Sequence, residues 1–279
     1  MEPWFAIARR DFHARCLSGP ITMTNGIPSI ADVSNGPSRE ISVGLIAKLG
    51  TSTDHALKPP GQTAGAMFES ACLTFIEQSL ARLTHIRPGT FRVAKGRSIS
   101  QFEQYAHLEE LRVLAEASRE LKTLLGTDYL IKPDVVVIRE PEEDFELNRN
   151  DQLVDETISR RTSLRKANGA KASLHASISC KLTIRSDRVQ NTRSEALNLL
   201  RNRKGRAPHI VAVTAEPTPS RIAAIALGTG DIDCVYHFAL NELVEVLREQ
   251  SRESLDLVET MIEGKRLRDI SDLPLDLVI

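Results

Sequence analysis

The chain has 279 residues, of which 36 are Lys or Arg and 37 are Asp or Glu, giving a net charge of −1. This balance argues against a protein that is basic throughout, although a local basic patch can hide in the sum. Hydrophobic residues make up 41% of the chain and charged residues 26%, which is typical of a globular protein. Aromatic residues make up only 4%, which argues against a platform for stacking bases or sugars.

The cysteines are far apart, at Cys16, Cys72, Cys180 and Cys234. Their spacing predicts neither a zinc ribbon nor a disulfide framework, and it suits a reducing cytosol. No apolar run is long enough to span a membrane, and the N-terminus lacks the apolar stretch of a signal peptide. The sequence has no glycine-rich phosphate loop, so neither ATP nor a methyl-donor cofactor is indicated. We therefore expect a cytoplasmic protein with no membrane partner.

The first half of the chain begins with a stretch rich in Gly and Pro at 18–37, which predicts an irregular arm or loop. Apolar residues at helical spacing then predict two helices, over 63–83 and 101–125. Residues 129–138 form an apolar run rich in β-branched side chains, which predicts a buried strand.

The second half alternates predicted strands and helices. Residues 174–184 alternate small polar and apolar side chains, which predicts a strand with two different faces. We further expect a helix over 192–203, strands over 209–215, 221–227 and 233–238, and a helix over 240–250. Strands interleaved with helices indicate an α/β protein with a central mixed sheet flanked by helices. With no place to divide the chain, we expect a single domain over 1–279.

Charge is distributed unevenly along this chain. Residues 181–206 hold eight basic and two acidic side chains, a local net charge of +6, whereas 139–156 hold two basic and eight acidic ones, a local net charge of −6. Either segment can be an ordinary solvated face. The basic segment can equally be a surface that binds DNA.

Three residues have the spacing of a possible catalytic site. Asp134 follows Pro133 at the start of an apolar strand, Lys181 lies on the half-polar strand, and Glu195 lies on the helix after it. If the two strands are neighbours, Asp134 and Lys181 converge at one sheet edge, and the helix can bring Glu195 over them. The alternative is that all three are unrelated surface charges, and spacing alone does not decide.

Two carboxylates and one lysine suit metal-assisted hydrolysis of a phosphodiester. Mg²⁺ prefers oxygen ligands and also binds a substrate phosphate oxygen. It lowers the pKa of bound water and neutralises charge that develops on the phosphate. A lysine beside that water can orient it.

A Pro-Asp pair followed on a later strand by an acid-x-Lys motif resembles the PD-(D/E)XK nucleases. In this chain Ser179 replaces the acid, in Ser179-Cys180-Lys181, and Glu195 from the next helix supplies the missing carboxylate. That variant resembles the NgoMIV-type type II restriction endonucleases, which read sites with a CCGG core. The resemblance is strongest over residues 175–240 and in the closing ISDLPLDLVI, and it extends over essentially the whole chain.

The resemblance implies roles for the site residues and a restriction-endonuclease-like fold. Asp134 and Glu195 would bind two Mg²⁺ ions per active site, with the main-chain carbonyl of Cys180 completing a metal shell. Lys181 would activate or position the nucleophilic water. Glu69 matches a further family carboxylate, beside the second metal or orienting Lys181; otherwise it is an ordinary solvated helix residue.

The segment Arg185-Ser186-Asp187-Arg188 carries the side chains that read C·G pairs. Arginine donates two hydrogen bonds to guanine in the major groove, and aspartate accepts one from cytosine. A local ion pair between Asp187 and Arg188 is the alternative. With the resemblance, Arg185, Asp187 and Arg188 become the expected readers of the CCGG core.

The resemblance also implies the outer base pairs, the cut and the assembly. Arg221, Gln62 and Ser34 would read the outer pairs of a GCCGGC site. The double-stranded DNA would be cut after the first G, leaving 5′ overhangs with 5′-phosphates. The enzyme would be a homotetramer, acting in a bacterial restriction-modification system beside a cognate DNA methyltransferase.

Two other functions fit the same residues. A structure-selective or repair nuclease would share Asp134, Lys181 and Glu195 without needing the reader segment. A sequence-specific DNA-binding protein would need the readers without catalysis.

Overall fold

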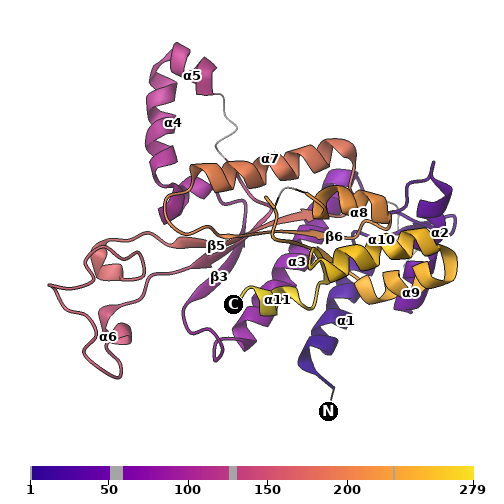
Figure 1. The fold of residues 1–279 in the computed structure, drawn as a ribbon, viewed down its shortest axis with the longest axis horizontal. Coiled ribbons are helices and arrows are strands. Elements are labelled where there is room, and N and C mark those ends of the chain that lie inside the picture. Colours follow the sequence, from indigo (N-terminus) through magenta and orange to yellow (C-terminus); the bar gives the residue numbers. More distant parts are fainter. Residues whose placement is uncertain (1, 51–58, 126–130, 229) are drawn as a thin grey trace.

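The computed structural model describes residues 2–50, 59–125, 131–228 and 230–279, and a six-stranded β-sheet lies at its centre (Figure 1). The strands lie in the order β3-β4-β5-β6-β7-β8. Neighbours from β3 to β5 are antiparallel, and those from β5 to β8 are parallel. Their bounds are β3 (Phe91–Lys95), β4 (Val135–Arg139), β5 (Ser173–Lys181), β6 (His209–Thr214), β7 (Cys234–His237) and β8 (Leu267–Asp269).

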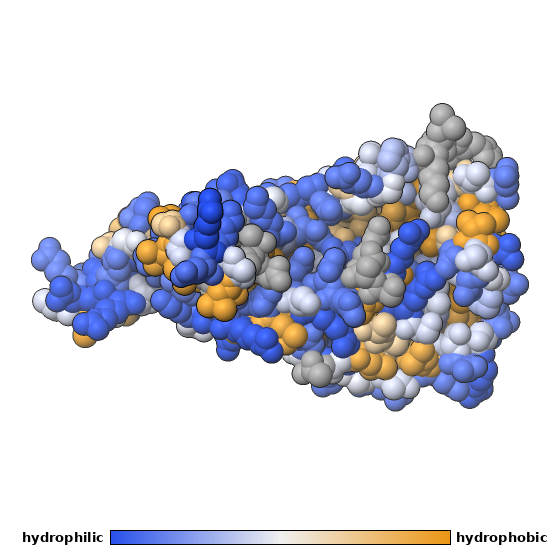
Figure 2. Space-filling view, turned by 90° about the horizontal axis from the view of Figure 1, so that it is seen from above, coloured by the Kyte–Doolittle hydropathy of each residue, from blue (hydrophilic) through white to orange (hydrophobic). Residues whose placement is uncertain are grey.

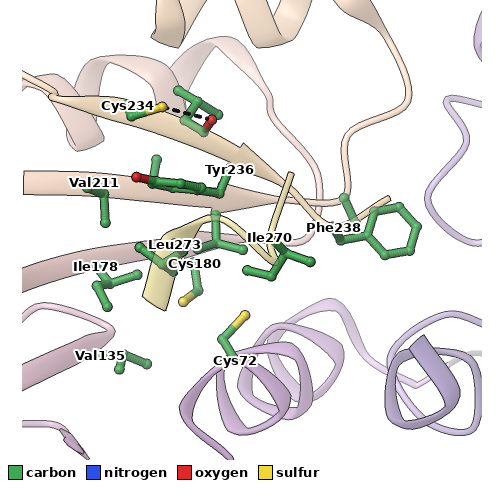
Figure 3. Packing of buried hydrophobic residues seen from close by; sticks show 14 of the residues in the cluster. Cys72, Val135, Ile178, Cys180, Val211, Cys234, Tyr236, Phe238, Ile270 and Leu273 are labelled. Carbon is green, nitrogen blue, oxygen red and sulfur yellow. Dashed lines mark hydrogen bonds between the residues drawn. The ribbon is translucent and has the colours of Figure 1, made fainter. Parts of the chain in front are cut away.

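Helices cover both faces of this sheet, which confirms the predicted α/β class with a mixed sheet. On β5, the hydroxyl of Ser179 lies 3.5 Å from that of Thr192 in α7, whereas the side chain of the next residue, Cys180, faces Cys72 in α3 (Figure 3). Consecutive strand residues point to opposite faces, so α7 and α3 lie on opposite sides of the sheet (Figure 1). The helices are α1 (Trp4–Leu17), α2 (Gly36–Leu49), α3 (Gly61–Arg82), α4 (His107–Ala117), α5 (Arg119–Leu125), α6 (Asp144–Leu147), α7 (Ser186–Asn202), α8 (Pro219–Ala226), α9 (Leu240–Gln250), α10 (Arg252–Glu263) and α11 (Leu273–Asp276).

The core runs through the middle of the sheet because both of its faces are covered. Val135, Val136 and Val137 of β4 are all fully buried, which explains why their sequence is continuously apolar rather than alternating. Across the sheet, Val135 pairs with Ile178 of β5, which pairs with Val211 of β6, and Figure 3 shows the three side chains in a row.

The predicted helices over 63–83 and 240–250 are confirmed as α3 and α9. The predicted helix over 101–125 is interrupted. Two 3₁₀ turns, Ile99–Gln101 and Glu103–Tyr105, precede α4, and the extended backbone of Ser118 (φ −131°, ψ 120°) separates α4 from α5. Gly126, the glycine expected to end this predicted helix, lies outside the described residues.

The predicted strand over 221–227 is wrong, because these residues belong to helix α8. Pro219 occupies the first turn, where its missing N–H has no helical partner to lose. Ile222, Ile225 and Ala226 are buried at spacings of three and four residues, the pattern of a helix face. The apolar run in the sequence is too short to show whether its period is that of a helix or of a strand.

Three predicted boundaries shift. Strand β5 ends at Lys181 rather than at 184, and α7 begins at Ser186, six residues before the predicted helix over 192–203. The strand predicted over 129–138 is β4, which begins at Val135 after Asp134, while residues 126–130 lie outside the described part. The strands over 209–215 and 233–238 are confirmed as β6 and β7.

Two segments lie outside the main sheet. Within 18–37, β1 (Met23–Thr24) and β2 (Ile27–Pro28) form a small antiparallel pair. The acidic arm, residues 140–172 with α6, extends from one end of the sheet (Figure 1) and forms the narrow, largely hydrophilic end of the molecule (Figure 2). Its acids pair locally, as in the 2.5 Å ion pair between Arg165 and Asp144. The acidic segment therefore fits a solvated face.

Candidate active site

Strands β4 and β5 bring Asp134 and Lys181 together, as predicted. Asp134 directly precedes β4, and Val135 pairs with Ile178 on β5, so the two strands are antiparallel neighbours. The Nζ atom of Lys181 donates to Oδ2 of Asp134 at 2.8 Å, and the backbone N–H of Cys180 donates to the same oxygen at 2.8 Å. This carboxylate is thus held in place by one charged and one main-chain donor.

Helix α7 places Glu195 beside this pair. Burial raises the pKa of the Glu195 carboxyl, the positive charge of Lys181 opposes this effect, and the negative charge of Asp134 adds to it. The same helix is fixed on the sheet by Thr192, which is buried against Ser179. Asp134, Lys181 and Glu195 therefore form one cluster at the carboxyl end of β5.

The side chain of Cys180 is not exposed at this cluster. It is buried between β5 and α3, where the sulfurs of Cys180 and Cys72 face each other (Figure 3). The hydrogen bond with Cys72, together with burial, raises the pKa of the Cys180 thiol well above its usual range. At this position only the main chain of Cys180 remains for the metal role that the resemblance implies.

The donors of the cluster suit a magnesium ion. In the described part of the chain, no group of three or more His, Cys, Asp or Glu residues is placed to hold a metal ion by itself. Two carboxylates would leave most of the coordination shell to water, a main-chain oxygen and the substrate phosphate. That is how Mg²⁺ is usually bound in phosphoryl-transfer sites. A cation there would also favour the charged form of Glu195, whose pKa is raised mainly by burial and to a smaller extent by the charge of Asp134.

Glu69 lies on α3, at the edge of the site. Its Oε2 atom is 3.4 Å from Nζ of Lys95 on β3, and its charge, like that of Asp134, acts on the nearby thiol of Cys72. Lys181 is hydrogen-bonded to Asp134. Glu69 is therefore close to the cluster but pairs with a different lysine.

The reader segment follows directly. Arg185 is exposed and stands at the N-cap of α7. Asp187 and Arg188 lie in the first turn of this helix. Their side chains lie outside the described part of the structure. The helix therefore fixes the backbones of Asp187 and Arg188, which lie six and seven residues after Lys181 in the sequence.

The structure also gathers two of the three predicted outer readers. Ser34, Arg185 and Arg221 line one open pocket of about 810 Å³. Arg221 pairs with Asp32, whose Oδ1 accepts from the backbone N–H of Ser34 at 3.1 Å and from its hydroxyl at 2.6 Å. These bonds to Ser34 and Arg221 lower the pKa of Asp32 to about 2. Gln62 does not line this pocket; it is exposed in the first turn of α3.

Sequence analysis missed Asp32 and Glu216. Glu216 is fully buried behind the readers, where it accepts hydrogen bonds from the N–H groups of Ile184 at 2.8 Å and Thr218 at 3.1 Å. Its Oε1 atom also lies 3.8 Å from Arg221. Burial raises the pKa of Glu216, and these partners oppose the effect. An acid placed directly after a buried strand was the signal that could have identified it.

Comparisons with known proteins identify a family for this chain. The model of the family described as "NgoMIV restriction enzyme" matches residues 12–279. The chain is 54% identical over 287 residues to the type II restriction enzyme NgoMIV of Neisseria gonorrhoeae, covering 100% of both sequences. Among solved structures, a complex of the restriction endonuclease PspGI with substrate DNA aligns at a TM-score of 0.31 and 17% identity, over 86% of this chain and 72% of that one. No helix among the described residues is long and apolar enough to cross a membrane.

Proposed function

Because the chain belongs to the NgoMIV restriction enzyme family and is thus a type II restriction endonuclease, we propose that it cuts double-stranded DNA at GCCGGC. The cut falls after the first G and leaves 5′ overhangs with 5′-phosphate and 3′-hydroxyl ends. Family membership favours this function over a repair nuclease or a DNA-binding protein without catalysis. The expected substrate, DNA, follows from the enzyme class.

One observation carries the proposed chemistry: Asp134 is bonded to Lys181 and to the N–H of Cys180, with Glu195 beside them. Asp134, Glu195 and the main-chain carbonyl of Cys180 would hold two Mg²⁺ ions. When bound, the Mg²⁺ ions would lower the pKa of a coordinated water, and they would place positive charge next to the scissile phosphate. Lys181 would hold the attacking water in line, and its ammonium would stabilise the negative charge that develops on the water oxygen.

The role of Glu69 follows from its place at the edge of the cluster. Its carboxylate is 3.4 Å from Lys95, so in the DNA-free enzyme it is neutralised by that lysine. We assign it to the side of the second metal rather than to the orientation of Lys181, because Asp134 already orients that lysine.

Base reading is divided between two parts of the same surface. Arg185, Asp187 and Arg188 read the CCGG core from the start of α7, next to the catalytic lysine. Arg221, Ser34 and Gln62 read the outer pairs. The pocket that Ser34, Arg185 and Arg221 line together supports the proposal that both sets act on one continuous surface.

The remaining assignments concern assembly and setting. A palindromic site read by two equal halves needs a two-fold dimer, and we propose that two dimers form a homotetramer. Each chain is a single nuclease domain over 1–279. We place the enzyme in the bacterial cytoplasm, together with a cognate DNA methyltransferase that protects the host's own sites.

Cutting a plasmid library and sequencing the new ends tests the site and the cut position together. We expect one palindromic sequence, GCCGGC, with every end starting after the first G. Ends at many sequences, or at another fixed one, would contradict the proposed readers. Removing divalent metal with EDTA should stop cutting, and Mg²⁺ should restore it; cutting that persists in EDTA would refute the metal assignment.

A further inference from the structure

A second charged hollow lies at the amino end of β5, away from the candidate active site. It encloses about 230 Å³ between the start of β5, the end of β4, the start of β6 and the segment that follows α7. We call this hollow the basic pocket, after six of the residues that line it: Arg87, Arg139, His175, Lys204, Arg206 and His209.

Three of the four cations of the basic pocket, Arg139, Lys204 and Arg206, have no carboxylate partner among the residues that the structure describes. The two acids of its lining are engaged elsewhere: Glu140 pairs with Arg92, and Glu103 accepts the backbone N–H of Lys171 at 3.0 Å. The fourth cation, Arg87, donates to an oxygen of Ile279, the last residue of the chain. Elsewhere in the protein, surface cations commonly pair with acids, so this concentration of unpaired positive charge is unusual.

Two buried nitrogen atoms of the basic pocket also lack a hydrogen-bond partner within the described residues: Nε of Arg139 and Nε2 of His209. Buried polar atoms are nearly always hydrogen-bonded. Nε of Arg139 is always a donor, so it lacks an acceptor, and Nε2 of His209 is a second donor in the tautomer that carries its proton there. The charges also repel one another, since burial and the charges of Arg206 and Arg139 lower the pKa of Arg87. An anion would satisfy the nitrogen atoms and relieve this repulsion together.

We propose that the basic pocket binds a phosphate-type oxyanion. Guanidinium groups present forked N–H donors that match the oxygens of a tetrahedral anion, and the lysine adds a point charge. A volume of about 230 Å³ is smaller than the roughly 300–1,000 Å³ of pockets for drug-sized ligands, which favours a single phosphate group over a nucleotide. That group can be free inorganic phosphate or part of a DNA backbone.

Inorganic phosphate is the probe that tests the proposal. Titration by calorimetry, with chloride at matched ionic strength as the reference, should give saturable binding of one phosphate per chain. Saturation is essential as a criterion, because phosphate also stabilises proteins generally by exclusion from their surfaces. A linear, unsaturable response would overturn the proposal.

Arg206→Ala is the diagnostic variant, and Arg252→Ala, which changes an exposed arginine of α10, is its matched control. Loss of one charge-assisted contact should weaken phosphate binding roughly tenfold or more, whereas the control should bind like the wild type. Equal binding by both variants would overturn the proposal. Circular dichroism confirms that each variant is folded.

A short duplex without the cognate site then distinguishes the two sources of phosphate. If the duplex displaces inorganic phosphate from the wild type, the basic pocket takes a DNA backbone phosphate; if it does not, the pocket takes the free ion. Both results support an oxyanion site. Since neither measurement depends on DNA cutting, the proposal fails or holds independently of the cleavage chemistry.

Discussion

The two ends of β5 carry opposite kinds of site. At the carboxyl end, Lys181 is paired with Asp134, and Glu195 adds a second negative charge. At the amino end, His175 lies near Arg139, Lys204 and Arg206, which have no acid partner in the described structure. Nine residues of strand, roughly 26 Å, separate the two ends.

This difference shows that the neighbours of a strand, rather than the strand itself, set the chemistry at each end. The carboxyl end meets the residue before β4 and the middle of α7, which bring carboxylates. The amino end meets the end of β4 and the segment after α7, which bring cations. A net charge of −1 conceals both sites, because it sums all charges of the chain and carries no information about where they lie.

The largest effect is expected from Lys181→Ala, which removes the cation of the carboxyl end. Its Nζ atom lies 2.8 Å from Oδ2 of Asp134, and no other side chain among the described residues donates to this carboxylate. Cleavage under single-turnover conditions should fall by about 10²–10³-fold, the range for the loss of one donor that stabilises developing negative charge. Specific binding in Ca²⁺, measured by gel shift, should survive because the readers are unchanged.

Lys48→Ala provides the control for this loss, since Lys48 pairs with Glu249 on the surface. It should cut like the wild type. If Lys181→Ala also cuts normally, or loses specific binding along with cutting, Lys181 is not the catalytic cation and the contrast between the two ends is broken.

The second effect concerns the amino end. Burial lowers the pKa of His175 to about 4, from an ordinary value near 6.5. The folded protein holds this imidazole neutral, whereas the unfolded chain binds a proton below about pH 6.5. The folded state therefore loses stability relative to the unfolded one as the pH falls from 6.5 toward 4. The free energy of unfolding should drop by up to about 3 kcal/mol over this range from His175 alone.

Urea unfolding at several pH values, in buffer without phosphate, measures this change. His175→Gln cannot gain the charge, so its curve should be flatter between pH 6.5 and 4 than that of the wild type. His85→Gln, at an exposed histidine, should leave the slope unchanged. Parallel curves for His175→Gln and the wild type would refute the assignment of acid sensitivity to this end.

For the carboxyl end of β5, the sequence predicted both strands and the convergence of Asp134 and Lys181 if those strands were neighbours, and the structure confirms that they are. The alternation around Ser179 and Lys181 identified the strand and its polar face, and Pro133-Asp134 identified its neighbour. Both signals are local, so they survive without knowledge of the fold. The amino end gave no such signal, because Arg87, Arg139 and Arg206 are far apart in the chain and meet only in the folded sheet.

The errors in secondary structure have the same origin. Residues 221–227 have an apolar run that fits a strand as well as a buried helix, and only packing against the rest of the protein selected α8. The apolar period of 101–125 continues through the break at Ser118. Asp32 and Glu216 were missed because their roles depend on Arg221, which is remote in sequence from Asp32.

The third effect sharpens the specificity assigned to the surface beside the carboxyl end. Arg221→Ala should reduce discrimination at the outer base pair by about 1–3 kcal/mol, the worth of a good bidentate contact. Cleavage of GCCGGC should be compared with sites that keep the CCGG core but change the outer pair. Discrimination within the core should be preserved, since Arg185 and α7 remain.

Arg10→Ala, at an exposed arginine paired with Glu2, serves as the control and should discriminate normally. If Arg221→Ala weakens binding to all sequences equally, the residue contacts only phosphate. The division between core and outer readers would then need other residues.

The smallest effect is on stability, and it reverses the pH behaviour of the amino end. Burial raises the pKa of Glu195, so the charged carboxylate costs stability at neutral pH, and this cost disappears as the group becomes protonated. Glu195→Gln replaces it with a neutral side chain of the same shape and should raise the free energy of unfolding by about 0.5–2 kcal/mol while cutting is lost. Glu77→Gln, at an exposed position of α3, should change neither quantity. A less stable Glu195→Gln enzyme would show that the attraction of Lys181 exceeds the cost of burial, and the carboxyl end would then be a stabilising ion cluster instead of a site that trades stability for metal binding.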